Sequence, residues 1–378
     1  MKKIVIIGSA YPLRGGGLAT FNERLARAFK QNGHQVRIET FSLQYPSFLF
    51  PGKTQYSDEA APDDLDITVS VNSINPFNWI KIGRMLRKEK PDLVVLRYWI
   101  PFISPSLGTI ARIIRKNKHT KVVAIADNII PHEKRVGDAM LSNYFVNSVD
   151  GFVTMSKTVM DDLDKFDQKK PRLFNPHPLY DNFGGIIDKK EAREKLGLQA
   201  DEKYLLFFGF IRDYKGLDLL LQAMTDSRIK QENIKLIIAG EFYSGEEKYR
   251  QYIAEHHLSR SLILHTDFIP NTKVGLYFNA CDVIVQPYKT ATQSGVTQIG
   301  YHFEKPMIVT NVGGLPEIIL HDKTGYVCEV NAKDIADYIL KFYHENKAND
   351  FSPYIIEEKK KYSWKKLVGA IFKVSGLD

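Results

Sequence analysis

The sequence has only two cysteines, Cys281 and Cys328, and both lie in apolar stretches without the short spacing of a metal-binding pair. This small number excludes a disulfide-rich secreted scaffold and argues against a cysteine-based metal site. We therefore expect a protein of the reducing cytoplasm.

Long apolar runs are also absent. No stretch reaches the roughly 18 apolar residues that a transmembrane helix needs, so none is predicted. The first residues, MKKIVIIGSAYP, begin like a signal peptide, but the apolar run Ile4–Ile7 is short and glycines follow it. We interpret this segment as a first buried strand.

The common nucleotide-binding motifs are missing, because neither GxGxxG nor GK[ST] follows the first strand, which disfavours a dehydrogenase. Instead, GSAYPLRGGGLATF (8–21) places Gly15, Gly16 and Gly17 directly before a helix that begins near Leu18. Such glycines let a ligand approach the backbone and expose amide groups at a helix start. The pattern predicts a ligand-binding loop, with a merely flexible turn as the alternative.

Positive charge is concentrated in the first half. Residues 1–185 hold 26 basic and 18 acidic residues, whereas residues 186–378 hold 26 of each. No helix-turn-helix, zinc finger or aromatic-rich RNA motif accompanies this charge, so nucleic acid is not a predicted partner. The surplus favours contact with an anionic membrane or a polyanionic substrate, and a solvated lysine-rich surface is the alternative. The densest runs are RMLRKEK (84–90), RIIRKNKHTK (112–121) and KFDQKKPR (165–172).

Short apolar runs alternate with helical patterns along the whole chain, and 378 residues are too many for one ordinary domain. This alternation predicts an α/β fold of two doubly wound, Rossmann-like domains, residues 1–180 and 186–360, with ligands bound in a cleft between them. A linker rich in proline and glycine, NPHPLYDNFGG (175–185), separates them. The sequence leaves open whether a last helix, residues 363–375, crosses back to the first domain. The predicted strands are Lys3–Gly8, Gln35–Phe41, Asp66–Val71, Leu93–Leu96, Lys121–Asp127, Gly151–Met155, Tyr204–Gly209, Lys235–Ala239, Ser261–His265, Val283–Gln286, Met307–Thr310 and Gly325–Cys328.

The stretch FFGFIRDYKGLDLLLQA (207–223) carries the clearest chemical signal. A predicted strand ends at the turn of Gly209, and Arg212 and Lys215 then precede a leucine-rich helix. An arginine fork and a movable lysine at a helix start suit a diphosphate. A surface pair on an ordinary loop is the alternative.

A second helix start follows in QPYKTATQSGVTQIGYHFEKPMIVTNVGGLPEIILHDKTGYV (286–327). Its amides would face Arg212 and Lys215 around two phosphate groups. The residues that we expect to contact the ligand here are Ser294, Gly295, Val296, Thr297 and Gln298.

The order of these pieces resembles the retaining nucleotide-sugar glycosyltransferases of family 4, which have the two-Rossmann GT-B fold. The resemblance implies that the second domain binds the nucleotide diphosphate sugar, that the first binds the acceptor, and that Arg212 and Lys215 bind the diphosphate. It spans nearly the whole chain. It rests on the glycines at 15–17, the segment 207–223, KLIIAGEF (235–242), DFIPNTKVGLYFNACDVIVQPY (267–288), KPMIVTNVGGLPEII (305–319) and TGYV (324–327).

The sequence departs from the family at one place. The family has two glutamates before the Lys-Pro turn, and those positions hold Ala291 and Ile299 here. We expect the neighbouring Gln298 to substitute for the second glutamate, which holds the ribose hydroxyls in the family. In the first domain, Asp127 and His132 are candidates for acceptor binding or proton handling, and a loop histidine bonded to backbone is the alternative for His132.

The predicted function is metal-independent transfer of a hexose, with retention, from a nucleotide sugar to a sugar or lipid-linked acceptor in the synthesis of envelope polysaccharide or glycolipid. No cofactor is expected, since the nucleotide sugar is a substrate. The predicted location is cytoplasmic, at the inner face of the membrane if the basic half binds lipid. Two alternatives stay open: a sugar-nucleotide epimerase of similar fold and a non-catalytic nucleotide-sugar-binding subunit.

Overall fold

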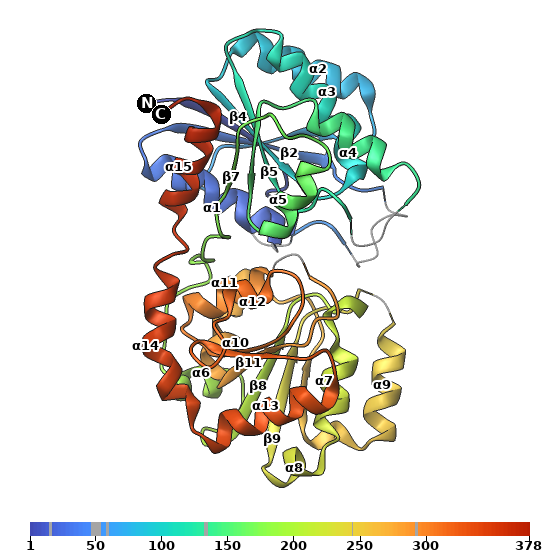
Figure 1. Ribbon diagram of the computed structural model, residues 1–378, viewed down its shortest axis with the longest axis vertical. Helices are drawn as coiled ribbons and strands as arrows, with labels where there is room; N and C mark the ends of the chain where they lie inside the picture. Colours follow the sequence, from blue (N-terminus) through green and yellow to red (C-terminus); the bar gives the residue numbers. More distant parts are fainter. Residues whose placement is uncertain (15–16, 47–53, 58–59, 132–134, 244, 292–293) are drawn as a thin grey trace. The chain divides into compact units, whose positions relative to one another are not determined.

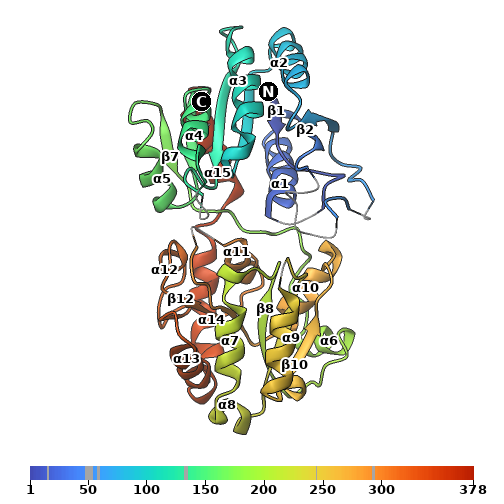
Figure 2. The same cartoon turned by 90° about the vertical axis from the view of Figure 1, so that its right-hand side faces the viewer.

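The computed structural model describes residues 1–14, 17–46, 54–57, 60–131, 135–243, 245–291 and 294–378. The chain divides into two compact units: Met1–Pro178 together with Ser363–Asp378, and Leu179–Tyr362. Each unit is an α/β sandwich around one parallel sheet (Figures 1 and 2). The predicted α/β class with two doubly wound, Rossmann-like domains is confirmed.

The sheet of the first unit has the order β3-β2-β1-β4-β5-β6-β7, and every pair of neighbouring strands is parallel. Strands such as LVVLRY, which is buried throughout, are continuous apolar runs because helices cover both faces of the sheet. The strands are β1 (Lys3–Ile7), β2 (Gln35–Leu43), β3 (Ile67–Asn72), β4 (Leu93–Tyr98), β5 (Lys121–Ala126), β6 (Gly151–Thr154) and β7 (Arg172–Phe174).

Helices α2, α3 and α4 cover one face of this sheet, and α1 and α15 lie together on the other (Figure 1). Gly151 of β6 lets α15 approach closely, because a Cβ there would lie 2.5 Å from Cγ1 of Val374. The chain therefore returns at its C-terminus to complete the first unit. The helices are α1 (Gly17–Gln31), α2 (Pro76–Glu89), η2 (Pro101–Ile103), α3 (Ser104–Arg115), α4 (Asp138–Val146), α5 (Lys157–Asp164) and α15 (Trp364–Ser375).

The second unit repeats this design with a sheet of order β10-β9-β8-β11-β12-β13, again parallel throughout. Its strands are β8 (Lys203–Phe208), β9 (Ile234–Ala239), β10 (Leu262–His265), β11 (Val283–Gln286), β12 (Met307–Thr310) and β13 (Gly325–Cys328). Its helices are α6 (Lys189–Lys195), η3 (Asp213–Lys215), α7 (Leu217–Met224), α8 (Ser227–Gln231), α9 (Glu246–Glu255), η4 (Leu258–Arg260), α10 (Asn271–Ala280), α11 (Gly295–His302), α12 (Leu315–Ile318), α13 (Ala332–His344) and α14 (Lys347–Lys359).

In each sheet there is one point from which successive strands are added outward in opposite directions. The first sheet grows outward from β1 on one side and from its neighbour β4 on the other, and β8 and β11 play the same parts in the second sheet. Ligands of open parallel sheets bind beyond the carboxyl ends of the strands at such a point. The residues that follow β1, β4, β8 and β11 are therefore the first candidates for a functional site.

Among the described residues, no helix combines the length and the apolar character that crossing a lipid bilayer requires.

Candidate functional site

The carboxyl end of β8 leads into the turn that the sequence singled out. Gly209 has φ 95°, a conformation that favours glycine, and its N–H donates to the carbonyl oxygen of Ala239 on the neighbouring strand. The 3₁₀ helix η3 ends at Lys215, and Gly216 (φ 70°) connects it to α7, which begins at Leu217. Two glycines thus turn the chain sharply enough to bring Lys215 back over the end of β8.

The ammonium group of Lys215 lies over Gly209. A Cβ built at Gly209 would come 2.9 Å from Nζ of Lys215 and 3.9 Å from Cγ2 of Val296, so the lysine head and the start of α11 border one point. Lys215 is only 9% exposed, and no carboxylate of the described residues forms an ion pair with it. Burial, together with the positive charge of Arg212, lowers the pKa of Lys215 to about 8. A buried ammonium group without a carboxylate partner is stabilised when an anion binds beside it.

Arg212 is exposed, and aromatic rings support its guanidinium group. Its Cζ lies 4.8 Å from the ring centroid of Tyr243 and 5.7 Å from that of Tyr214, which are cation–π distances. The neighbouring carboxylate of Asp213 pairs instead with Lys248 and Lys289. Two cations of different kinds, one buried and one exposed, therefore follow β8.

The start of α11 is capped by Ser294. Its hydroxyl oxygen accepts a hydrogen bond from the N–H of Val296 (3.2 Å) and lies 3.2 Å from the hydroxyl of Tyr288. The N-terminus of a helix carries a partial positive charge. The ring of Tyr180 lies against Gly295, because a Cβ at Gly295 would come 3.0 Å from that ring. Together with Lys215, this helix start forms a positively polarised group beyond β8 and β11, and such a group can hold phosphate oxygens.

Gln298 is fully buried, and neither atom of its side-chain amide has a hydrogen-bond partner among the described residues. The positions of the two family glutamates, Ala291 and Ile299, are buried as well. A side chain with no exposed surface touches no ligand, so contact between Gln298 and a ribose would require α11 to shift. That contact stays a prediction, as does the ligand-binding role of Thr297, which is also fully buried.

In the first unit, Asp127 follows β5 and is held by a residue that sequence reasoning missed. Arg97 of β4 donates from Nε and Nη2 to the two carboxylate oxygens of Asp127, at 2.6 Å each, and both side chains are buried. The guanidinium group also lies 3.7 Å from the ring centroid of Phe21 on α1. The sequence contained one sign of this buried pair, a single arginine within the otherwise apolar strand LVVLRY. This pair ties β4, β5 and α1 together, and a role of Asp127 in proton transfer stays a prediction.

The remaining predicted residues lie at the same edge or outside the described residues. Gly17 begins α1, and a Cβ there would meet no atom within 4 Å, so the space beside it is open. Gly15, Gly16 and His132 lie outside the described residues. His177, in the segment after β7, is not one of the predicted site residues. It is buried, its ring contacts Phe21 edge-on at 5.1 Å, and burial lowers its pKa to about 3.

The described residues contain no group of three or more histidine, cysteine, aspartate or glutamate side chains that could hold a metal ion. The polar groups of the candidate site in the second unit are basic side chains, hydroxyls and helix amides. They suit a ligand that brings its own negative charge.

Comparison with known protein families gives two adjoining matches. Residues 188–360 match the family described as Glycosyl transferases group 1, and residues 15–174 match Glycosyltransferase Family 4. The first match contains the turn at Gly209, Lys215 and the start of α11. The second contains the Arg97–Asp127 pair.

Full-length relatives agree with these matches. The chain is 26% identical to an uncharacterised glycosyltransferase of Methanocaldococcus jannaschii, over 96% of this chain and 95% of the relative. Among solved structures, HepE of Anabaena in complex with UDP aligns with a TM-score of 0.74 at 14% identity, over 99% of this chain and 100% of that one. WaaG, a glycosyltransferase involved in lipopolysaccharide biosynthesis, aligns with a TM-score of 0.70 at 15% identity, over 99% and 100%. These structures share the GT-B fold of two Rossmann-like domains.

Proposed function

We propose that this chain, a glycosyltransferase built from a family 4 domain and a group 1 domain, moves a hexose from a nucleotide diphosphate sugar to a hydroxyl acceptor with retention. One observation carries the proposal. The buried ammonium group of Lys215 has no carboxylate partner among the described residues and lies beside the start of α11, beyond the carboxyl end of β8. A diphosphate is the anion that this position suits.

The proposed chemistry breaks the bond between the anomeric carbon and the β-phosphate oxygen, while the acceptor oxygen forms a new bond to the same carbon. The departing oxygen becomes negative as the sugar becomes oxocarbenium-like. Lys215, Arg212 and the first amides of α11 would stabilise this developing charge. The acceptor proton would pass to the departing phosphate oxygen, so that atoms and charge balance without a protein nucleophile. Attack from the face that the phosphate leaves retains the anomeric configuration.

The donor is proposed by analogy. The structures of HepE of Anabaena with UDP and with UDP-glucose support a uridine diphosphate sugar as the first donor to test. We also propose that the reaction needs no divalent metal, because a buried lysine, an arginine and a helix N-terminus can together balance the charge of the leaving diphosphate. Activity that survives chelation by EDTA would support this part of the proposal.

The acceptor is proposed from the charge of the first domain, whose basic surplus suits an anionic surface. We propose a growing envelope polysaccharide or a lipid-linked sugar as acceptor, with the enzyme in the cytoplasm at the inner face of the membrane. The role of WaaG in lipopolysaccharide biosynthesis is consistent with this class of product.

A non-catalytic nucleotide-sugar-binding subunit is the second candidate, and one observation favours it. Ala291 and Ile299 stand where the family has glutamates, so neither side chain can accept a hydrogen bond from a sugar or ribose hydroxyl. This candidate predicts donor binding without turnover. The epimerase alternative predicts a changed nucleotide sugar without any acceptor.

The test is a thermal-shift panel of nucleotide sugars, followed by an assay of donor hydrolysis and transfer with the best ligand. We expect one donor to raise the melting temperature and to be hydrolysed slowly without acceptor. Stabilisation without hydrolysis or transfer would favour the binding subunit. No stabilisation by any nucleotide sugar would contradict the proposal.

A further inference from the structure

The three basic runs of the first unit converge on one edge of its sheet. Each run ends just before a strand: 84–90 before β4, 112–121 at the start of β5, and 165–172 at the start of β7. Because all the strands are parallel, these segments meet at the amino-terminal edge of the sheet. The predicted acceptor residue Asp127 lies at the opposite edge, one six-residue strand or about 20 Å away.

Direct contacts join these runs. The side-chain amide of Asn117 donates to the carbonyl oxygen of Arg87 (3.3 Å), and the hydroxyl of Thr120 donates to that of Pro91 (2.6 Å). Burial lowers the pKa of Lys170, and the carboxylates of Asp167 and Asp150 oppose that shift. The positive charges of Arg115 and Arg112 lower this pKa as well, so Lys170 of the third run lies within electrostatic reach of the second run. The three basic runs therefore lie close together at this edge, and carboxylates such as Asp92, Asp150 and Asp167 lie among them.

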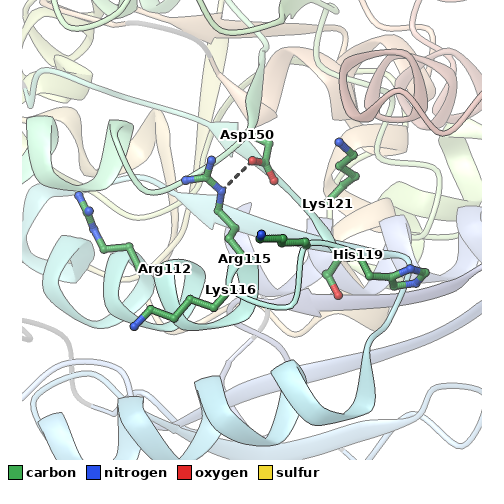
Figure 3. A pocket seen from close by; sticks show the side chains of 8 residues that line it. Arg112, Arg115, Lys116, His119, Lys121 and Asp150 are labelled. Carbon is green, nitrogen blue, oxygen red and sulfur yellow. Dashed lines mark hydrogen bonds and ion pairs between the residues drawn. The ribbon is translucent and has the colours of Figure 1, made fainter.

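A hollow of about 340 Å³ opens at this edge between the end of α3 and the start of β5 (Figure 3). Its lining contains five basic side chains and one acidic one: Arg112, Arg115, Lys116, Lys118, Lys121 and Asp150. The single carboxylate is already engaged, because Asp150 accepts from Nε of Arg115 at 2.7 Å.

The other charges of the hollow have little compensation. His119 lies 3.8 Å from Asp92, and Arg112 donates to the hydroxyl of Ser148. No carboxylate of the described residues pairs with the ammonium groups of Lys116, Lys118 and Lys121. Cations crowded around one concave site repel one another, and a multiply charged anion relieves that repulsion.

We propose that this hollow is a second anion site, separate from the donor site, which binds a phosphate group with at least two negative charges. The chemical class is a phosphate monoester or a pyrophosphate, free in solution or on a lipid headgroup. The lysines supply charge that adapts to the ligand, and the guanidinium groups of Arg112 and Arg115, held in place by Ser148, Tyr144 and Asp150, add fixed positive charge beside them. Because the hollow lies within the first unit, this inference does not depend on the proposed function.

The experiment uses two probes and a charge-reversed variant, Lys116→Glu with Lys118→Glu. Both lysines are exposed, so the fold should persist, which circular dichroism and the melting temperature check. Inorganic pyrophosphate is titrated calorimetrically into protein that also carries Lys215→Met, so that the donor site does not contribute. Vesicles of phosphatidylcholine with phosphatidic acid, a monoester, are compared with vesicles that carry phosphatidylglycerol, a diester, at equal surface charge.

The matched control is Lys365→Glu with Lys366→Glu, which makes the same charge change on exposed positions of α15. We expect the hollow variant to bind pyrophosphate about tenfold more weakly and to lose its preference for phosphatidic acid, and the control to change neither. Pyrophosphate binding without vesicle binding identifies a soluble ligand, and the reverse identifies a lipid headgroup. Equal losses in both variants, binding that follows vesicle charge alone, or tighter binding of a single-stranded RNA would overturn the proposal.

Discussion

The ammonium group of Lys215 occupies the space that a side chain at Gly209 would fill, since a Cβ at position 209 would come 2.9 Å from Nζ. The glycine therefore does two things. It adopts φ 95° at the end of β8, and it leaves room for a buried cation beside the start of α11. The position of Lys215 depends on the absence of a side chain six residues earlier.

The first prediction follows from this relationship. Gly209→Ala should push Lys215 out of its place and weaken nucleoside diphosphate binding by about tenfold, beyond the roughly 1 kcal/mol of backbone strain that the substitution adds. Gly184→Ala is the matched control, because Gly184 has φ 92° and open space beside it. Calorimetric titration with UDP measures affinity, and thermal melting measures strain. Equal loss of affinity in both variants would contradict the prediction.

The second prediction concerns pH. Burial lowers the pKa of Lys215 to about 8, so the ligand-free lysine loses its proton as the pH rises through that value. Affinity for UDP should hold near pH 7 and fall above about pH 8, by up to tenfold per pH unit, because the diphosphate itself is already fully ionised there. Lys215→Arg keeps its charge and should bind with little dependence on pH over this range. If UDP affinity changed with pH in the same way in both proteins, Lys215 would not be the group responsible for the pH dependence.

The lowered pKa of Lys215 has the opposite effect on folding: the stability of the ligand-free protein should increase as the pH rises. The unfolded lysine keeps its proton up to a pKa near 10.5, so the unfolded state binds more protons than the folded state between about pH 8 and 10.5. The contribution of Lys215 to the stability of the ligand-free protein should therefore increase with pH in that window. Urea unfolding at pH 8 and pH 10 should show this increase in the wild type, and it should be smaller in Lys215→Met.

The strands could be predicted from sequence because most strands of a doubly covered parallel sheet are short apolar runs, and all twelve predicted strands matched β-strands of the two sheets. β7 (Arg172–Phe174) has three residues and follows a basic run, so it lacked that signal. The turn at Gly209, the cations after it and the cap at Ser294 were readable because local chemistry defines them. The burial of Lys215 was not, because it depends on packing against α11.

The pairing of Asp127 with Arg97 and the burial of Gln298 could not be predicted from the sequence, for different physical reasons. Arg97 pairs with Asp127 across neighbouring strands, 30 residues apart. The hydrophobic pattern of a strand does not show which of its residues contact a neighbouring strand. Gln298 was chosen because it adjoins Ile299 in sequence. Adjacent residues on a helix point about 100° apart, so a neighbour does not inherit the direction of the residue it replaces.

The third prediction tests the two cations directly. Arg212→Ala and Lys215→Ala should each lower transfer by about 100-fold or more if they stabilise the leaving diphosphate, with little loss of folding stability for the exposed Arg212. Lys230→Ala, an exposed lysine in α8, is the control and should transfer normally. Steady-state transfer from the donor found in the thermal-shift panel is the measurement. Unchanged turnover in both site variants would contradict a role of Arg212 and Lys215 in the transfer reaction.

The fourth prediction concerns the buried pair in the first unit. Asp127→Leu or Arg97→Met should each destabilise the protein by about 3–5 kcal/mol, because each removes one partner of a buried charge pair. The double variant Arg97→Met with Asp127→Leu should recover much of that loss. Urea unfolding of all four proteins closes the cycle. If Asp127→Asn folds as well as the wild type but transfers far more slowly, then the carboxylate acts in the reaction and not only in the fold.

The last prediction separates a structural from a ligand-binding role for Gln298. Its buried amide has no partner among the described residues, and an unpaired buried polar group costs about 1–3 kcal/mol. Gln298→Leu, similar in size, should therefore raise the stability of the ligand-free protein by about 1 kcal/mol, whereas Gln222→Leu on the exposed face of α7 should not. If the amide never meets the donor, UDP affinity stays unchanged in the variant. A loss of affinity with a gain in stability would mean that α11 shifts when the nucleotide binds, because only then can a fully buried amide reach a ribose.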